Sequence, residues 1–368
     1  MKGLAMRVLI TGNMGYVGPV VVAHLRATFP EADLIGYDTA LFGAQIITDE
    51  PLPERRLSRQ IFGDVRDLPP ALLEGVDVVV HLSAISNDPM GNRFEAATES
   101  INYAASVRLA EAARAAGVPC FVFASSCSVY GAADGPARRE GDSLNPLTAY
   151  ARSKIGTEEA LMSLDTGDMT ITCLRFATAC GMSPRLRLDL VLNDFVAAAL
   201  TSGEVKVLSD GTPWRPLIDV ADMARAIEWA MGRDAAAGGR FLTINTGADR
   251  QNYQVSELAE TVAQAVPGTT VSINREAPPD RRSYRVDFGL YRELAPAHQP
   301  QVSLADSVSQ LYAGLRGARG LSADFRRSDA MRLYTLERHI EAGRLGIDIR
   351  WTDAVRAADH ARSTAQVA

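Results

Sequence analysis

Short apolar runs alternate with stretches of helical periodicity through the first half of the chain. The runs that predict strands lie at residues 7–11, 33–37, 76–82, 120–124 and 169–176. A helix at 19–29 is indicated by the four-residue spacing of Val17, Val21 and Leu25, and an Ala-rich helix at 101–116 ends at a glycine. Strands this apolar are buried on both faces, as in a parallel sheet covered by crossover helices. The pattern predicts an α/β fold with a doubly wound parallel sheet.

The second half of the chain is less regular. Strands are expected at 205–208 and 241–246, and helices at 220–231 and 251–266. Residues 184–192 read as a basic loop that runs into a further helix. This half therefore predicts a smaller C-terminal lobe beside the sheet.

Composition excludes several classes of protein. Of the 368 residues, 47% are apolar and 22% are charged, which is typical of a globular protein rather than a disordered one. The net charge of −6 disfavours a nucleic-acid binder, and no apolar run is long enough for a membrane span. The four cysteines form no Cys/His cluster, so we expect no metal and no disulfide scaffold. The N-terminal segment lacks the features of a secretory signal, which predicts a cytoplasmic protein.

A glycine-rich turn connects the first predicted strand to the helix that Pro19 opens. Its glycines at 12, 15 and 18 allow a tight turn and close approach of the backbone to a pyrophosphate. The helix N-terminus adds free N–H groups and a favourable dipole. A turn without a ligand is the alternative, but a strand before it and a helix after it are the context of a Rossmann-type dinucleotide site. Asp38 ends the second strand, where a carboxylate accepts hydrogen bonds from a ribose and repels a 2′-phosphate, so NAD is favoured over NADP.

A candidate reactive pair lies on a later helix. Tyr150 and Lys154 are four residues apart and share one helix face, where an ammonium group lowers the pKa of a nearby phenol. Ser126 follows the strand at 120–124, and ligands collect at the carboxyl ends of parallel strands. Such a Tyr/Lys pair alone is common on helix surfaces. Its combination with the glycine-rich turn and the serine-rich strand end indicates an active site.

Three motifs, in this order and spacing, resemble the extended short-chain dehydrogenase/reductase superfamily, and within it the NAD-dependent nucleotide-sugar epimerase/dehydratase family. They are TGNMGYVG at 11–18, SSCSVYG at 125–131 and YARSK at 150–154. GDVRD at 63–67 and HLSA at 81–84 support the resemblance. The resemblance implies three parts of the chain: a dinucleotide-binding domain at 1–180 and 213–250, a substrate-binding lobe at 181–212 and 251–317, and a C-terminal helical extension at 318–368.

The resemblance also implies roles for single residues. Ser126, Tyr150 and Lys154 would be catalytic, with Tyr150 as the acid/base. Cofactor contacts are implied for Tyr150 and Lys154. They are also implied for Gly12, Asn13, Met14, Gly15, Tyr16, Val17, Gly18, Asp38, Asp64, Val65, Leu82, Ser83, Ala84 and Asn102. Substrate contacts are implied for Ser126, Asn193, Arg215, Arg281 and Arg282. For each arginine the alternative is an exposed surface charge, and for the 63–67 segment it is an aspartate that caps a helix.

These observations predict an NAD-dependent epimerase that acts on a nucleotide-activated sugar through a transient keto-sugar. The alternatives are a net NAD(H)-dependent oxidoreductase, either a keto-sugar reductase or a dehydrogenase, and a non-catalytic NAD-binding protein. Cys127 and Ser128 occupy the places where 4,6-dehydratases of the superfamily carry an acidic pair, which disfavours that reaction. Asp88 either contacts the sugar or starts a turn at Pro89.

We expect a homodimer, with no nucleic-acid or membrane partner. In the resembled family the helices that correspond to 101–116 and 150–164 pair across a two-fold axis. Beyond the family core, the spacing of Leu333, Leu336 and Ile340 predicts an amphipathic helix that serves packing or oligomerisation.

Overall fold

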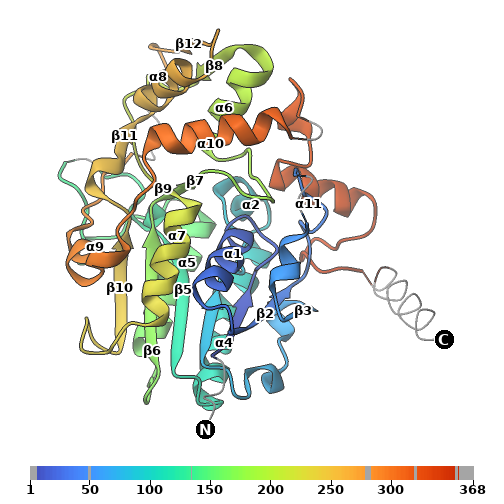
Figure 1. Cartoon of the computed structure of the whole chain (residues 1–368), viewed down its shortest axis with the longest axis vertical. Helices are drawn as coiled ribbons and strands as arrows, with labels where there is room; N and C mark the ends of the chain where they lie inside the picture. Colours follow the sequence, from blue (N-terminus) through green and yellow to red (C-terminus); the bar gives the residue numbers. More distant parts are fainter. Residues whose placement is uncertain are drawn as a thin grey trace.

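Seven parallel strands form the central sheet of the protein (Figure 1). The structure, a computed structural model, describes residues 6–48, 51–133, 135–277, 283–318, 321–352 and 355. The strands lie in the order β10-β6-β5-β4-β1-β2-β3. Their bounds are Arg7–Thr11 for β1, Asp33–Asp38 for β2, Arg59–Phe62 for β3, Val78–His81 for β4, Cys120–Ser126 for β5, Thr170–Phe176 for β6 and Phe241–Thr246 for β10. The predicted doubly wound parallel sheet is confirmed.

Alternate residues of β1 explain why helices cover both faces of the sheet. Val8 and Ile10 are buried in a core that includes side chains of α1 (Gly18–Thr28) and α7 (Val220–Met231). Leu9 points to the opposite face, where it joins a core that includes side chains of α4 (Ala105–Ala115). The side-chain period of two in a strand therefore produces two cores from one apolar run. Helix α5 (Ala149–Ser163) contacts α4 on this second face.

The smaller lobe lies beyond one end of the sheet (Figure 1). It contains the helices α6 (Val191–Ser202), α8 (Val255–Ala265) and α10 (Leu304–Arg316) together with the parallel pair β8 (Glu204–Val207) and β12 (Thr270–Ile273). A further sheet has the order β11-β9-β7, with bounds Asn252–Gln254, Trp214–Asp219 and Thr178–Cys180. Both this sheet and the lobe lie at the carboxyl ends of the strands of the central sheet.

Two helices differ from the pattern predicted by the sequence. The helix expected at 251–266 begins only at Val255, because Gln254 and Glu257 form a capping box and residues 252–254 pair with β9 instead. The helix expected at 101–116 is preceded by α3 (Glu95–Thr98) and by a π-helical turn at Glu99–Ala104. That turn directs Asn102 into the interior, where its side chain bonds both backbone groups of Ile85 at 2.8 and 2.9 Å. Local periodicity contains no signal for either contact.

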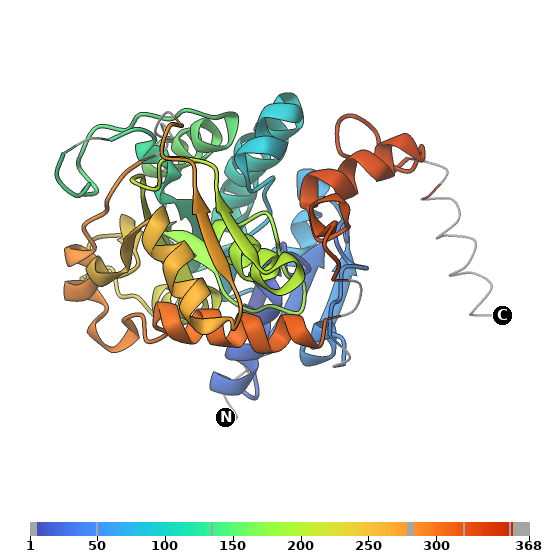
Figure 2. The ribbon, with the colours of Figure 1, turned by 90° about the horizontal axis from the view of Figure 1, so that it is seen from above.

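The C-terminal segment packs against the β2 and β3 side of the central sheet of its own chain. Helix α11 (Arg332–Glu341) confirms the predicted amphipathic helix, with Leu336 buried. Figure 2 shows this segment beside the β2 and β3 edge of the sheet. Arg66 donates hydrogen bonds to the carbonyls of Asp348 (2.8 Å) and Ile349 (3.0 Å), and the Trp351 indole donates to the Thr39 carbonyl (2.7 Å).

Three observations bear on the expectations from composition. All four cysteines are free and buried. Within the described ranges, no group of His, Cys, Asp and Glu side chains is arranged to hold a metal ion. Among the helices that the structure describes, none is long and apolar enough to cross a membrane.

Candidate active site

A cavity of about 1080 Å³ lies along the carboxyl edge of the central sheet. Residues that follow β1, β2, β4, β5 and β6 line it, and residues of α6, β8 and β9 close it from the side of the smaller lobe. Ligands of doubly wound folds bind at this edge, because the strand order reverses there and leaves a crevice. Pockets for single small molecules occupy roughly 300–1,000 Å³, so this cavity is at the upper end of that range.

The glycine-rich turn forms one wall of the cavity. Gly12 has a φ of 77°, and a Cβ atom there would come within 2.6 Å of the Ser83 backbone nitrogen. A Cβ atom at Gly18 would overlap the backbone of Asn13, so both positions require glycine. Helix α1 begins at Gly18, with no capping side chain from Val17 and no acidic residue in its first turn. The turn therefore fits a pyrophosphate, which the helix N-terminus attracts.

Asp38 lines the cavity at the end of β2. Its carboxylate accepts hydrogen bonds from the backbone N–H groups of Met14 (3.0 Å) and Ala40 (2.7 Å). Burial raises the pKa of Asp38, and these two hydrogen bonds, with the guanidinium groups of Arg185 and Arg332, oppose that rise. The carboxylate is thus held in one orientation beside the glycine-rich turn, as a ribose ligand requires.

Asp64 and Val65 line the cavity next to this carboxylate, as do Leu82, Ser83 and Ala84 after β4. Arg66 forms an ion pair of 2.6 Å with Asp64 and also donates its backbone N–H to it at 2.9 Å. Asp64, rather than Asp67, is therefore the residue that caps the short helical turn Val65–Asp67. The sequence suggested Asp67 as the residue that caps a following helix, and this is wrong, because Asp67 ends the short turn; Asp64 both caps the turn and lines the cavity wall.

Three residues predicted to contact the cofactor lie behind the cavity wall. Asn13, Met14 and Asn102 are buried and do not line the cavity. The amide of Asn13 donates to the Gln60 side chain at 2.6 Å, and Asn102 clamps Ile85 as described above. Their side chains hold the loops that form the wall.

Asn193, predicted to approach the substrate diphosphate, is also fully buried on α6. Its amide accepts a hydrogen bond from the Gly181 backbone (3.1 Å) and donates to the Arg187 carbonyl (2.9 Å) and the Tyr16 hydroxyl (3.1 Å). Arg215 on β9 does line the cavity. Arg281 and Arg282 lie outside the described residues.

The structure brings Ser126, Tyr150 and Lys154 together at the cavity. Burial raises the pKa of Tyr150 to about 12, while a hydrogen bond with Ser126 and the charge of Arg187 act to lower it. The Lys154 ammonium donates to the Ala124 carbonyl at 2.6 Å and lies 5.7 Å from the centre of the Tyr150 ring. Burial lowers the pKa of Lys154 to about 8. A phenol and two proton-exchanging neighbours thus meet at the end of β5.

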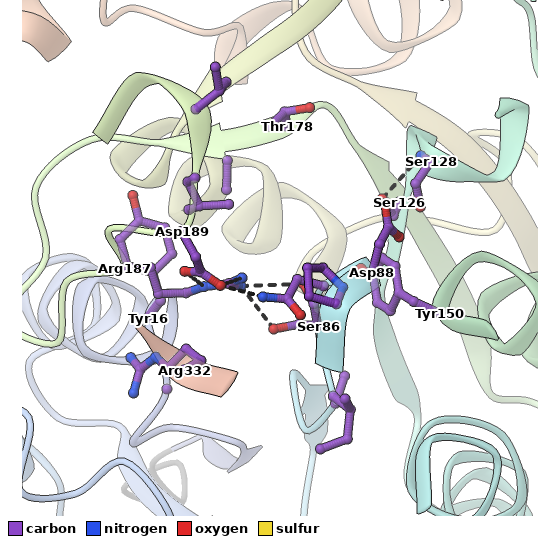
Figure 3. A pocket seen from close by; sticks show the side chains of 18 of the residues that line it. Tyr16, Ser86, Asp88, Ser126, Ser128, Tyr150, Thr178, Arg187, Asp189 and Arg332 are labelled. Carbon is purple, nitrogen blue, oxygen red and sulfur yellow. Dashed lines mark hydrogen bonds and ion pairs between the residues drawn. The ribbon is translucent and has the colours of Figure 1, made fainter. Parts of the chain in front are cut away.

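Two further polar residues line the cavity: Asp88, for which the sequence left a sugar contact or the start of a turn open, and Arg187, which the sequence analysis did not assign. Asp88, which begins α2 (Asp88–Arg93), accepts a hydrogen bond from the Thr148 hydroxyl at 2.8 Å. The buried Arg187 pairs with Asp189 at 2.8 Å. Figure 3 shows Tyr150 on the side of Ser126 and Asp88, with Arg187 and Asp189 across the cavity. Asp88 follows the end of β4 by a few residues, and this position at the carboxyl edge was the available signal.

A second unassigned group comes from the C-terminal extension. Met331, Arg332 and Ile349 line the cavity on the side of Asp38 and the glycine-rich turn. Nothing in the local sequence pattern around these residues predicts a place in a ligand site, because the contacts that bring them there are long-range.

Residues 8–247 match the model of the NAD dependent epimerase/dehydratase family. A Bacillus subtilis protein with the name uncharacterized UDP-glucose epimerase YtcB is 31% identical over 70% of this chain and 82% of its own length. The UDP-glucose 4-epimerase of Mycolicibacterium smegmatis is 29% identical over 83% of this chain and 97% of its own.

Solved structures agree in fold over most of the chain. MoeE5 in complex with UDP-glucose and NAD matches with a TM-score of 0.68 and 28% identity, over 84% of this chain and 98% of its own. UDP-glucose-4-epimerase from Stenotrophomonas maltophila, with bound NAD, matches with a TM-score of 0.72 and 25% identity over the same shares. The chain therefore belongs to the NAD-dependent epimerase/dehydratase family, whose enzymes act on nucleotide sugars, and NAD is its cofactor.

Proposed function

We propose that this protein is an epimerase that inverts one carbon of a nucleotide-activated sugar through a transient keto-sugar. The observation that carries the proposal is that Tyr150, Ser126 and Lys154 line the same cavity as the glycine-rich turn, with the Lys154 ammonium 5.7 Å from the centre of the Tyr150 ring. The relatives named UDP-glucose epimerase and the complex of MoeE5 with UDP-glucose and NAD support a nucleotide sugar as the substrate.

In this proposal Tyr150 removes the proton from a sugar hydroxyl and later returns it to the ketone oxygen. Ser126, which acts to lower the pKa of Tyr150, would hold that oxygen beside the phenol. Lys154, four residues later on α5, favours the tyrosinate through its positive charge. Gly12, Gly15 and Gly18 would hold the pyrophosphate of NAD, and Asp38 its ribose. Bound NAD supplies a hydride acceptor for the carbon that is oxidised and then reduced.

The remaining part of the cavity suits the sugar nucleotide. Arg215 lines it from β9, and a guanidinium group binds a diphosphate through two parallel hydrogen bonds. Asp88 lies within electrostatic reach of the Tyr150 phenol, on the side where the sugar would bind. We therefore place the diphosphate near Arg215 and the reacting sugar between Asp88 and Tyr150.

The residues after Ser126 favour epimerisation over 4,6-dehydration. The Cys127 thiol is buried, donates to the Arg175 carbonyl at 3.0 Å and has a pKa that burial raises far above its usual value. Ser128 carries only a hydroxyl. Neither side chain can serve as the second acid/base that removal of water from the sugar would need.

A panel of UDP- and dTDP-sugars tests the proposal. The purified protein should release NAD on denaturation and should convert one panel member into an epimer with no net change in NADH absorbance. Net formation or consumption of NADH would establish the oxidoreductase alternative instead. If protein that contains NAD binds a sugar nucleotide but does not convert it, both the epimerase and the oxidoreductase functions would be contradicted. Tyr150→Phe serves as the inactive control.

A further inference from the structure

The C-terminal extension supplies part of the cavity wall at the cofactor end. Solved relatives such as MoeE5 match over 98% of their own length but over only 84% of this chain. Residues 331–352 belong to the region beyond the family-model match, which ends at 247. Figure 2 shows this segment beside the β2 and β3 edge, and its residues Met331, Arg332 and Ile349 reach the cavity.

Arg332 is a buried cation without a carboxylate partner among the described residues. Its side chain is 2% exposed and still lines the cavity. Its guanidinium donates hydrogen bonds to two neutral oxygens, the Gln45 side-chain carbonyl and the Arg185 backbone carbonyl. One face of the guanidinium lies 4.1 Å from the centre of the Phe42 ring. A buried charge that lacks an opposite charge is costly, so the site is built for an additional anion.

The neighbouring charges do not supply that anion. Arg185 pairs with Glu54 at 2.6 Å and Arg187 pairs with Asp189 at 2.8 Å, so Glu54 and Asp189 already have cations of their own. Asp38 also acts on Arg332 through its charge, but its carboxylate is held by the backbone N–H groups of Met14 and Ala40 and forms no ion pair with Arg332. Burial lowers the pKa of Arg332 to about 9, and the charges of Arg187 and Arg185 lower it further, against the opposing effect of Asp189 and Asp38. A phosphate group in the cavity would give the Arg332 guanidinium the ion-pair partner that it lacks.

The position of Arg332 favours the cofactor as the source of this phosphate. Asp38, the expected ribose ligand, and Phe42, which follows it in the loop after β2, are both neighbours of the guanidinium. In Figure 3, Arg332 and Tyr16 of the glycine-rich turn lie on one side of the cavity, and Tyr150 lies on the other. A cofactor phosphate at the turn is therefore the anion in reach.

Ile349 closes the same end of the cavity with a strained backbone. Its φ is 57°, a conformation that β-branched residues rarely adopt, and its side chain is 1% exposed. Hydrogen bonds from Arg66 to the carbonyls of Asp348 and Ile349 hold this conformation. Val65, for which a cofactor contact is expected, belongs to the same apolar cluster as Ile349. Strain of this kind persists where the surroundings fix it, often at a ligand clamp.

We propose that residues 331–352 form a strap that completes the NAD site, in which Arg332 binds a phosphate of the dinucleotide and Ile349 covers its adenosine end. The strap slows dissociation of NAD. This inference depends on NAD binding and not on which sugar reacts, so it stands or falls separately from epimerisation.

Arg332→Gln tests the phosphate contact, with Arg338→Gln as the matched control, since Arg338 is a half-exposed arginine of the same helix. The bound NAD is exchanged against labelled NAD, and the affinities of ADP-ribose, adenosine and UDP are measured by calorimetry. We expect Arg332→Gln to weaken NAD and ADP-ribose by roughly tenfold or more, the scale of a hydrogen bond to a charged group, and to leave adenosine and UDP unchanged. The control should change none of them.

Loss of UDP affinity with ADP-ribose unaffected would show that Arg332 serves the substrate, and would overturn the proposal. Unchanged affinity for every ligand, with a lower unfolding temperature, would also overturn it, because the role would then be structural. If Arg332→Gln fails to fold, Arg332→Lys is the alternative. It retains the positive charge but cannot form the two parallel hydrogen bonds that a guanidinium donates to a phosphate. It should bind ADP-ribose more weakly than wild type, and equal binding would contradict the proposal.

Ile349→Ala tests the covering contact, and Ile347→Ala is its control because Ile347 is 65% exposed two residues away. Ile349→Ala should release labelled NAD at least several-fold faster, while Ile347→Ala should release it at the wild-type rate. Equal rates for the two variants would show that the strap does not retain the cofactor.

Discussion

At the scale of single residues, the proposed chemistry depends on one phenol oxygen. Tyr150→Phe removes only that oxygen, at the cavity wall, so the fold and NAD binding should be kept. Turnover should fall by roughly a hundredfold or more, the usual contribution of a positioned acid/base. Steady-state rates on the true substrate check this, with the partly exposed Tyr103→Phe as the control. Near wild-type activity in Tyr150→Phe would mean that another group is the acid/base.

Two neighbours of Tyr150 should move its titration in opposite directions. The hydrogen bond from Ser126 lowers the pKa of Tyr150, and the charge of Asp88 raises it. Activity that needs tyrosinate rises with pH, so Ser126→Ala should shift the rising limb of the kcat/KM profile to higher pH. Asp88→Asn should shift the limb to lower pH. A shift of both variants in the same direction would contradict this account of the phenol.

We expect Asp38 to set the choice between NAD and NADP. A 2′-phosphate would meet the carboxylate that lines the cavity at the end of β2, so NAD should bind at least roughly tenfold more tightly than NADP. Asp38→Asn should bring the affinities for NAD and NADP closer together. Asp33→Asn, at the other end of the same strand, should leave the ratio of these affinities unchanged. Titrations of cofactor-free protein measure both. Equal affinities of wild type for the two cofactors would contradict the prediction.

At the scale of elements, the sequence predicts those helices and turns that depend on contacts between residues near each other in the chain. The helix predicted at 220–231 matches α7, because Asp219 caps it through a hydrogen bond to the Ala221 N–H at 2.9 Å. The turn at Gly12 and the position of Ser126 were predictable because both follow apolar strands. Arg332 was not, since its partners Gln45 and Arg185 lie 287 and 147 residues away in sequence. Tertiary contacts of that range leave no periodic signal.

Helix α5, which carries Tyr150 and Lys154, is anchored by a buried ion pair. Glu158 on α5 pairs with Arg175 on β6 at 2.6 Å, and both side chains are at most 6% exposed. Arg175→Ala should lower the free energy of unfolding by about 3–5 kcal/mol, because it leaves a buried carboxylate without its partner. Arg152→Ala, which removes an exposed pair between α5 and Glu95, should change it by less than about 1 kcal/mol. Denaturant titration compares the two, and similar values would contradict the anchoring role.

At the scale of the whole molecule, we expect assembly through the face that α4 and α5 cover. Met162 of α5 is 61% exposed and therefore serves as a site at which a charge can test this assembly. Light scattering at micromolar concentration should give the mass of a homodimer with an isologous interface. Met162→Lys should shift the mass toward the monomer, and Leu52→Lys, at a 54% exposed position elsewhere, should not. A monomeric wild type would exclude this assembly.

The contact between Trp351 and Thr39 joins residues that are 312 positions apart in sequence. A ribosome adds roughly 5–20 residues per second, so the two partners emerge at least about 15 seconds apart. During that interval the glycine-rich turn and Asp38 already exist, while the segment with Arg332 and Ile349 does not. Once β10, which ends at Thr246, completes the central sheet, we expect a nascent chain to be able to bind the cofactor through the side that residues 331–352 later cover. The cofactor would then bind first, and residues 331–352 would cover it afterwards.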